Sequence, residues 1–235
     1  MYPALLALKD GLVVSCQTSA GNPVMGPEPM TLMARAAETG GAVGFRAEGA
    51  LDIASIRSIS SLPIIGIRKT GRSAAGGVFI TPTFENAAEM AAAGADIIAL
   101  DGTARPRPSG QTLAGIILRI HEELGLPVMA DTDSIDSGLY AEDAGADVVG
   151  TTLSGYTTDM AVSDLPDLGL VAALVARLDR PVIAEGRYWT REEVALAYSS
   201  GAFSVVVGSA ITNPMMITRR MVAATPRATS NPGLT

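Results

Sequence analysis

The chain of 235 residues is long enough for one large domain or two small ones, and with 48% hydrophobic and 17% charged residues it has the composition of a soluble globular protein. Its net charge of −7 and the lack of any basic run argue against nucleic acids and anionic membranes as partners. The N-terminus does not resemble a signal peptide, and no apolar run reaches membrane-spanning length, so we expect a cytoplasmic protein. A single cysteine, Cys16, excludes an intrachain disulfide.

Short apolar runs that favour strands alternate with helical patterns along the chain, after a short leading helix expected at residues 3–10. The expected strands are Leu12–Cys16, Ala42–Arg46, Ile64–Arg68, Ile97–Leu100, Val128–Ala130, Val148–Thr151, Val182–Ala184 and Ser204–Val207. The expected helices lie near residues 29–39, 50–60, 84–93, 111–124, 134–144, 167–178, 190–200 and 214–223. Capping signals precede several of them, at Thr83, Ser134, Thr190 and Asn213.

Eight strand–helix units predict an α/β fold, a closed (β/α)8 TIM barrel of parallel strands that forms a single domain over residues 1–235. The alternative, an open doubly wound sheet, usually has a glycine fingerprint after its first strand, where this chain has Ser15-Cys16-Gln17-Thr18. A weak internal repeat also favours the barrel, because Ala93-Gly-Ala-Asp96 and Ala144-Gly-Ala-Asp147 each precede a strand. Only residues 225–235 are expected to form a loose tail.

In such barrels the active site lies at the C-terminal ends of the strands. Nearly every expected strand here ends in a polar residue, and five of these ends carry a charge. The ends in chain order are Gln17, Arg46, Lys69, Asp101, Asp131, Thr151-Thr152, Glu185 and Gly208-Ser209. Charges of both signs that converge on one rim indicate a functional site, by analogy with other barrels.

Lys69 follows the buried strand that Pro63 opens, and it is one of two lysines, with Lys9, in a chain that has fifteen arginines. A buried ammonium can lose its proton at accessible pH, whereas a guanidinium cannot. Lys69 is therefore the candidate proton-transfer residue. The plain alternative is a solvated lysine at a strand end.

Two glycine-bearing turns, Glu185-Gly186-Arg187 and Val207-Gly208-Ser209-Ala210, follow the last two strands. In this fold the turns at these two places often bind a phosphate group through backbone N–H groups. Arg187 either adds positive charge there or points to solvent. Ordinary strand-to-helix turns also use glycine, but two such turns in these positions favour a phosphate site.

Six segments, taken in order, resemble the bacterial N-acetylmannosamine-6-phosphate 2-epimerases. They are Gly11–Gln17, Ile64–Ile67 with Lys69, Asp96–Thr103 with Arg105–Pro108, Gly150–Thr157, Val182–Arg187 and Val206–Thr212. The resemblance runs from about residue 5 to 223, and its most specific parts are Gly-Thr-Thr-Leu-Ser-Gly-Tyr-Thr and Ile-Ala-Glu-Gly-Arg.

This resemblance implies a barrel that interconverts N-acetylmannosamine 6-phosphate and N-acetylglucosamine 6-phosphate in sialic acid breakdown, with no metal and no organic cofactor. It implies that Lys69 transfers the proton and that Glu185 is the acidic partner. The other residues implied to bind or orient the substrate are Gln17, Arg46, Asp131, Thr151, Gly186, Arg187, Gly208 and Ser209. One stretch departs from the family, since Lys69 is followed by the weakly charged loop Thr70–Gly77, which puts substrate closure and rate in doubt.

Inversion at C2 of a 2-acetamido sugar requires the open-chain aldehyde, in which the C2 hydrogen lies next to a carbonyl and can leave as a proton. Two alternatives remain on the same fold: a Schiff-base aldolase in which Lys69 attacks a carbonyl, and a sugar-phosphate-binding barrel without turnover. The abundance of apolar residues allows a homodimer. No spacing of His, Cys or carboxylates predicts a metal site, and the single histidine, His121, is expected on a helix surface.

Overall fold

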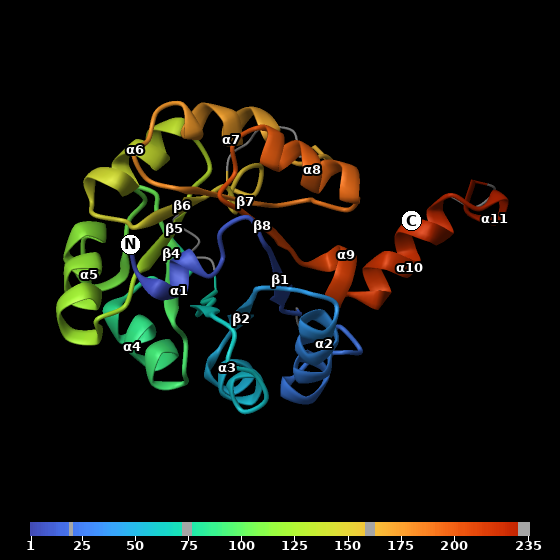
Figure 1. The fold of residues 1–235 in the computed structure, drawn as a ribbon, viewed down its shortest axis with the longest axis horizontal. Helices are drawn as coiled ribbons and strands as arrows, with labels where there is room; N and C mark the ends of the chain where they lie inside the picture. Colours follow the sequence, from blue (N-terminus) through green and yellow to red (C-terminus); the bar gives the residue numbers. More distant parts are fainter. Residues whose placement is uncertain (19–20, 72–76, 158–162, 230–235) are drawn as a thin grey trace.

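The structure is a computed structural model that describes residues 1–18, 21–71, 77–157 and 163–229 (Figure 1). Eight parallel strands pair in chain order and close into a barrel, because β1 pairs with β8 as well as with β2. The strands are β1 (Leu12–Cys16), β2 (Gly44–Glu48), β3 (Ile64–Ile67), β4 (Ile97–Asp101), β5 (Val128–Asp131), β6 (Val148–Gly150), β7 (Val182–Glu185) and β8 (Ser204–Val207). The predicted eight-fold barrel is confirmed, and the open doubly wound sheet is wrong.

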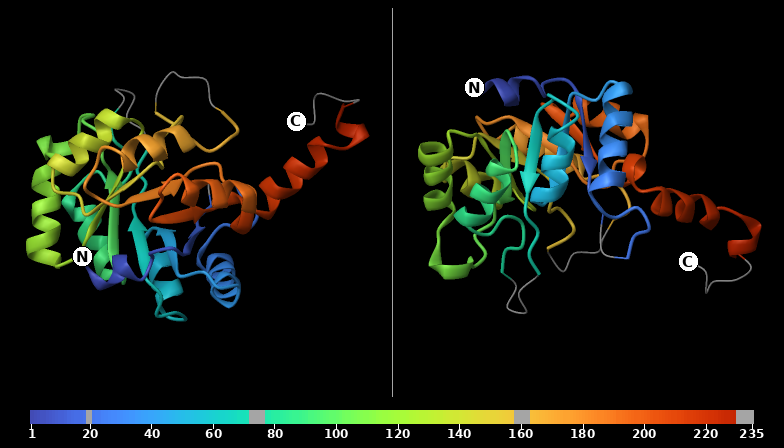
Figure 2. Two further views of the ribbon diagram at one scale, coloured as in Figure 1. Left: turned by 45° about the horizontal axis from the view of Figure 1, so that its top comes forward. Right: turned by 90° about the horizontal axis from the view of Figure 1, so that it is seen from below.

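Helices surround the barrel, as Figures 1 and 2 show. They are α1 (Pro3–Leu6), α2 (Pro27–Thr39), α3 (Ala50–Arg57), α4 (Phe84–Ala92), α5 (Leu113–Arg119), α6 (Ile135–Asp143), α7 (Leu168–Val175), α8 (Arg191–Ser199), α9 (Ser209–Thr212), α10 (Pro214–Ala223) and α11 (Pro226–Thr229). A 3-10 turn at Pro108–Gly110 precedes α5, and a π-helical turn at Ile120–Leu124 extends it. The four predicted caps are confirmed: Thr83, Ser134, Thr190 and Asn213 each accept a backbone N–H from the first turn of the helix that follows.

The second strand begins two residues later than the sequence suggests. Ala42 follows α2 and still bonds back to it, since its N–H donates to the carbonyl of Ala37 at 3.0 Å. β2 therefore runs from Gly44 to Glu48, with Arg46 in its middle and Glu48 at its exit. Arg46 therefore lies two residues before the end of the strand, inside the barrel instead of on its rim.

Alternate strand residues face two separate apolar layers. On β3, for example, Ile64 packs between barrel and helices, whereas Ile65 and Ile67 fill the barrel interior. Leu5 and Leu8 belong to the interior cluster as well, so the N-terminal segment closes the bottom of the barrel. The interior is thus filled with side chains, and the polar residues at the strand ends are confined to the opposite, upper end.

The two chain ends differ from the expected elements. The leading helix is a single turn, Pro3–Leu6, because the chain reverses at Asp10, which has a positive φ of 58°. In the expected tail, Pro226–Thr229 forms the short helix α11, while residues 230–235 lie outside the described residues. None of the helices in the described ranges is long and apolar enough to cross a membrane.

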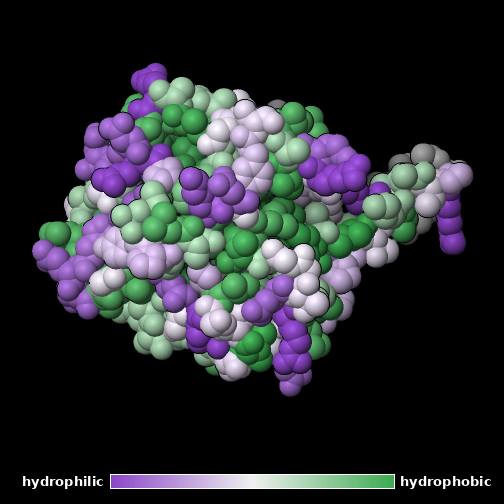
Figure 3. Space-filling view, viewed as in Figure 1, coloured by the Kyte–Doolittle hydropathy of each residue, from purple (hydrophilic) through white to green (hydrophobic). Residues whose placement is uncertain are grey.

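Helix α10 leaves the body of the barrel, as both views in Figure 2 show. None of its residues is buried. Met221 and Val222 are exposed on it, and Ile211 is exposed just before it, so apolar surface faces solvent where the chain leaves the barrel (Figure 3).

Candidate active site

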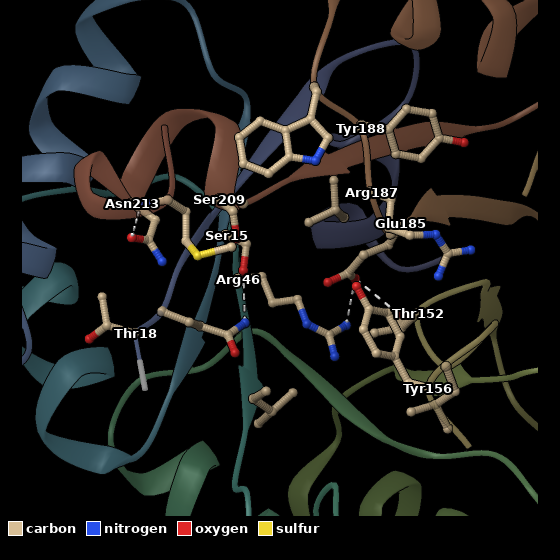
Figure 4. A pocket seen from close by; sticks show the side chains of 18 of the residues that line it. Ser15, Thr18, Arg46, Thr152, Tyr156, Glu185, Arg187, Tyr188, Ser209 and Asn213 are labelled. Carbon is tan, nitrogen blue, oxygen red and sulfur yellow. Dashed lines mark hydrogen bonds and ion pairs between the residues drawn. The ribbon is translucent and has the colours of Figure 1, made fainter. Parts of the chain in front are cut away.

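A cavity of about 640 Å³ opens among the strand exits (Figure 4). Of the predicted site residues, those that line it are Gln17, Arg46, Lys69, Glu185, Gly186, Arg187, Gly208 and Ser209. Asp131 and Thr151 are fully buried just behind its wall. The cavity therefore brings together side chains from strands at both ends of the sequence, which only a closed barrel does.

A buried ion-pair network forms the floor of the cavity. The Arg46 guanidinium donates two hydrogen bonds to Asp131, from Nη1 to Oδ1 at 3.0 Å and from Nη2 to Oδ2 at 2.6 Å. Nη1 also lies 3.1 Å from Oε2 of Glu185. Arg46 and Asp131 are 1% and 0% exposed, so this fork-to-fork pair is shielded from water. The Arg46 guanidinium thus pairs with both Asp131 and Glu185 and holds the two carboxylates in fixed positions.

Two adjacent threonines connect this network to strand β6. The Thr152 hydroxyl lies 2.6 Å from Oδ1 of Asp131 and 3.1 Å from Oε2 of Glu185. The Thr151 hydroxyl instead bonds to the backbone of Glu185, accepting its N–H and donating to its carbonyl. Thr152 therefore faces the cavity, whereas Thr151 fixes the backbone that carries Glu185.

The environment moves the pKa values of both candidate catalytic groups toward neutrality. Burial raises the pKa of Glu185 to about 7, against the opposing charge of Arg46. Burial and the Arg46 charge lower the pKa of Lys69, which Glu48 and Glu185 partly offset. Lys69 is exposed, because it lies in the open cavity. Its pKa is lowered nevertheless, because protein atoms pack densely around the cavity. These are the shifts that a general acid and a general base need near neutral pH.

Lys69 is held at the start of a loop that folds back over the barrel. Its backbone N–H donates to Oε1 of Glu48 at 3.2 Å, and it pairs with Ile80 in an antiparallel bridge. Ile80 in turn accepts the backbone N–H of Asp101, which is 0% exposed and does not line the cavity. Of the strand ends expected at the site, Asp101 is thus covered. In the loop Thr70–Gly77, residues 72–76 lie outside the described residues.

The two glycine turns lie at different places on the cavity, because Gly186 directly follows Glu185 of the ion-pair network and Gly208 follows β8. Gly186 has a φ of 118°, a conformation that residues with a Cβ rarely adopt. A Cβ at Gly208 would lie 3.2 Å from that of Ser15, so glycine lets the last turn pack closely on β1. Ser209 follows as the exposed first residue of α9. The turn at Gly208 contains no carboxylate, whereas the turn at Gly186 begins with Glu185.

Arg187 does not point a free guanidinium into the cavity. Its Nε donates to the carbonyl of Leu165 at 2.8 Å and its Nη1 to that of Ser154 at 2.6 Å. The guanidinium carbon lies 5.4 Å from the ring centroid of Tyr156. Arg187, with a positive φ of 62°, therefore holds the segment after β6 against the cavity.

The far end of that segment is fixed by a second arginine. Asp133 accepts hydrogen bonds from Nη2 of Arg105 and from the hydroxyl of Thr157, both at 2.5 Å. Arg105 also donates to the carbonyl of Thr157. The signature segment Gly150–Thr157 is thus held from both sides, with Tyr156 over the cavity (Figure 4).

Residues that the predicted site did not include also line the cavity, among them Ser15, Tyr156, Trp189 and Arg220. Ser15 accepts a hydrogen bond from Gln17 at 2.9 Å, as its place two residues earlier on one strand face allowed. Arg220 lies on α10, and no sequence signal pointed to it. Within the described ranges, no three His, Cys, Asp or Glu side chains come together as metal ligands.

Comparison with known proteins identifies relatives along most of the chain. A relative from Cutibacterium acnes is 48% identical over 216 residues, covering 91% of this chain and 93% of its own, and one from Caldanaerobacter subterraneus is 45% identical over 92% and 91%. Both carry the name "Putative N-acetylmannosamine-6-phosphate 2-epimerase". The solved N-acetylmannosamine-6-phosphate 2-epimerase of Clostridium perfringens superposes with a TM-score of 0.91 at 40% identity, covering 95% of this chain and 97% of that one.

A more distant match, a thiamine phosphate pyrophosphorylase from Pyrococcus furiosus, has a TM-score of 0.59 at 18% identity and shares the fold alone. Residues 30–227 match the family described as "Putative N-acetylmannosamine-6-phosphate epimerase". The family that the sequence motifs suggested is confirmed: the chain belongs to the N-acetylmannosamine-6-phosphate epimerase family.

Proposed function

We propose that this protein is a cytoplasmic epimerase that inverts C2 of N-acetyl-D-mannosamine 6-phosphate to give N-acetyl-D-glucosamine 6-phosphate in amino-sugar catabolism, without a cofactor. The observation that supports it best is the joint position of Lys69 and Glu185 in one cavity, with opposite pKa shifts toward neutrality. The names of the relatives supply the substrate.

The reaction begins with opening of the sugar ring, which exposes an aldehyde next to C2. The base then removes the C2 proton and leaves an enolate, and a proton returns to the opposite face. We assign the base to Lys69, because burial and the charge of Arg46 lower its pKa and so favour the neutral amine. Glu185, whose raised pKa keeps its proton near pH 7, opens the ring or returns the proton.

Arg46 stabilises the negative charge that develops at the aldehyde oxygen. It is already fixed by Asp131, so it needs no rearrangement during the reaction. Asp131 acts through Arg46 and Thr152, as a positioning residue. The turns at Gly186 and Gly208 bind the phosphate and anchor the substrate while the sugar changes shape.

The test is an assay of the purified protein with chelator and without added nucleotide, run in heavy water. Interconversion of the two hexosamine 6-phosphates with deuterium appearing at C2 supports the proposal. Trapping of a covalent adduct on Lys69 by borohydride would select the Schiff-base aldolase instead. Binding of the sugar phosphate with neither turnover nor exchange would select the binding protein.

We further propose that two copies of the chain associate through α10. A ten-residue helix with no buried residue is marginal in water on its own, and Met221 and Val222 are exposed on it. A second copy of the chain covers these side chains. Light scattering should give twice the chain mass of 24.1 kDa, and Met221→Asp should shift it toward one copy. A monomer at all concentrations would contradict this assembly.

A further inference from the structure

We infer that Arg220 of α10 supplies the cation for the substrate phosphate, and so makes the site specific for phosphorylated sugars. The inference rests on the proposed function, because it assigns one more residue to the same site. Arg220 lies outside the barrel strands and the turns that sequence motifs identify.

The first observation is the face that α10 turns toward the cavity. Asn213, Met216 and Arg220 line the cavity, on the same wall as Gly208 and Ser209. They are spaced three and four residues apart, so they form a single stripe of the helix. Although α10 points away from the barrel, its first two turns complete the wall beside the glycine turns.

The second observation is how Arg220 is held. Its guanidinium carbon lies 4.6 Å from the ring centroid of Trp189, which also lines the cavity. In a cation–π contact the ring occupies the flat face of the guanidinium. The N–H groups in its plane remain able to donate two parallel bonds to an anion, the geometry that suits phosphate.

The third observation concerns the other positive charges. Among the described residues that line the cavity, the cations are Arg46, Lys69, Arg187 and Arg220. Arg46 is paired with Asp131 and Glu185, and Arg187 donates to two carbonyls. In the described part of the chain, Arg220 forms no ion pair within 4.0 Å, so its charge is not yet neutralised.

A phosphate monoester carries a charge of about −1.5 to −2 near pH 7. Backbone N–H groups of the glycine turns can bind it but add no full positive charge. Lys69 must reach C2, which lies at the other end of the substrate from the phosphate on C6. Of the two arginines beside the glycine turns, Arg187 is already held by two carbonyls, which leaves Arg220 as the cation available to the phosphate.

The experiment compares Arg220→Gln with Arg219→Gln, a matched control. Arg219 is the preceding residue on α10, is exposed, and does not line the cavity. For N-acetylmannosamine 6-phosphate, kcat/KM of Arg220→Gln should fall about 10- to 100-fold, mainly through KM, the size of one lost charged hydrogen bond. For unphosphorylated N-acetylmannosamine, kcat/KM should stay within about twofold of wild type. Arg219→Gln should match wild type with both sugars.

Two further measurements separate this inference from the proposed function. The affinity of Arg220→Gln for N-acetylglucosamine 6-phosphate, measured by calorimetry, should be lower than that of wild type by the same factor. This test does not depend on turnover by the wild-type protein. Arg220→Lys, which keeps the charge but loses the two parallel donors, should lie between wild type and Arg220→Gln. Equal losses for phosphorylated and free sugar, or a loss shared by Arg219→Gln, would overturn the assignment.

Discussion

The two sides of the cavity are built in opposite ways. On the side of β2, β5 and β7, charged groups are buried, and Arg46, Asp131 and Glu185 bond directly to one another. On the side of β8 and α10, the wall consists of the turn at Gly208, the exposed Ser209 and a helix with no buried residue. The first side is rigid and has a low local dielectric, whereas the second is open to water.

This contrast separates chemistry from anchoring. Charges that must act on a proton or an oxyanion gain strength where water is excluded and the partners are already fixed. An anion that must enter and leave is better held by accessible N–H groups and a surface cation. Substitutions on the first side should therefore lower kcat and stability, and those on the second side should raise KM.

The largest expected effect is on Lys69. Lys69→Ala should lower kcat by about 10²- to 10⁴-fold and abolish deuterium exchange at C2, because the proton-transfer group is gone. Lys69→Arg should fail almost as badly, since a guanidinium keeps its proton. Lys9→Arg, at the other lysine, which is exposed, is the control and should have wild-type activity. A Lys69→Arg enzyme with a near-normal rate would leave Glu185 as the base.

The next effect is on stability, at Asp131. Asp131→Asn removes one of the two carboxylates that balance Arg46, which is 1% exposed, and breaking a buried ion pair costs about 3–5 kcal/mol. Urea unfolding should show this loss in the free energy of unfolding. Glu192→Gln tests the opposite case, because its pair with Arg191 is 65% and 94% exposed and its loss should leave the free energy of unfolding unchanged. Similar losses for the two variants would mean that burial does not distinguish the pairs.

Much of this architecture is predictable from sequence because local and tertiary signals agree. Ser204–Val207 is an apolar run after a glycine stop, and the structure gives the same bounds. Arg46 was misplaced, because whether Ala42 ends α2 or begins β2 depends on a hydrogen bond that sequence patterns do not show. Arg220 could not be found, because its place in the cavity depends on the direction in which α10 leaves the barrel. Sequence motifs indicate contacts within one strand or turn. They do not indicate where residues such as Arg46 and Arg220 lie relative to distant parts of the chain.

A smaller effect should appear in the pH profile. Since the pKa of Glu185 is raised to about 7 and the proposed mechanism uses its proton, kcat/KM should fall about tenfold per pH unit above that value, as one limb of a bell-shaped curve. Glu185→Gln should remove the pKa near 7 from the curve. Stability should change in the same direction: the folded state holds this proton more tightly than the unfolded chain, so its stabilising contribution is lost as the pH rises from about 4.5 to 7. An unchanged limb in Glu185→Gln would assign it to another group.

The smallest effect that we predict concerns the segment that carries Tyr156 over the cavity. Asp133 receives bonds from Thr157, Arg105 and Ser137, which outweigh its burial and hold the pKa of its carboxyl below the usual value. Asp133→Asn should weaken two of these bonds and loosen the end of the segment at Thr157, so KM should rise about 2- to 10-fold with little change in kcat. The matched control is Asp136→Asn, an exposed position on α6, which should match wild type. Because Asp133 acts only through the segment, deuterium exchange per turnover should be unchanged. A large drop in kcat would instead place Asp133 among the groups that take part in proton transfer.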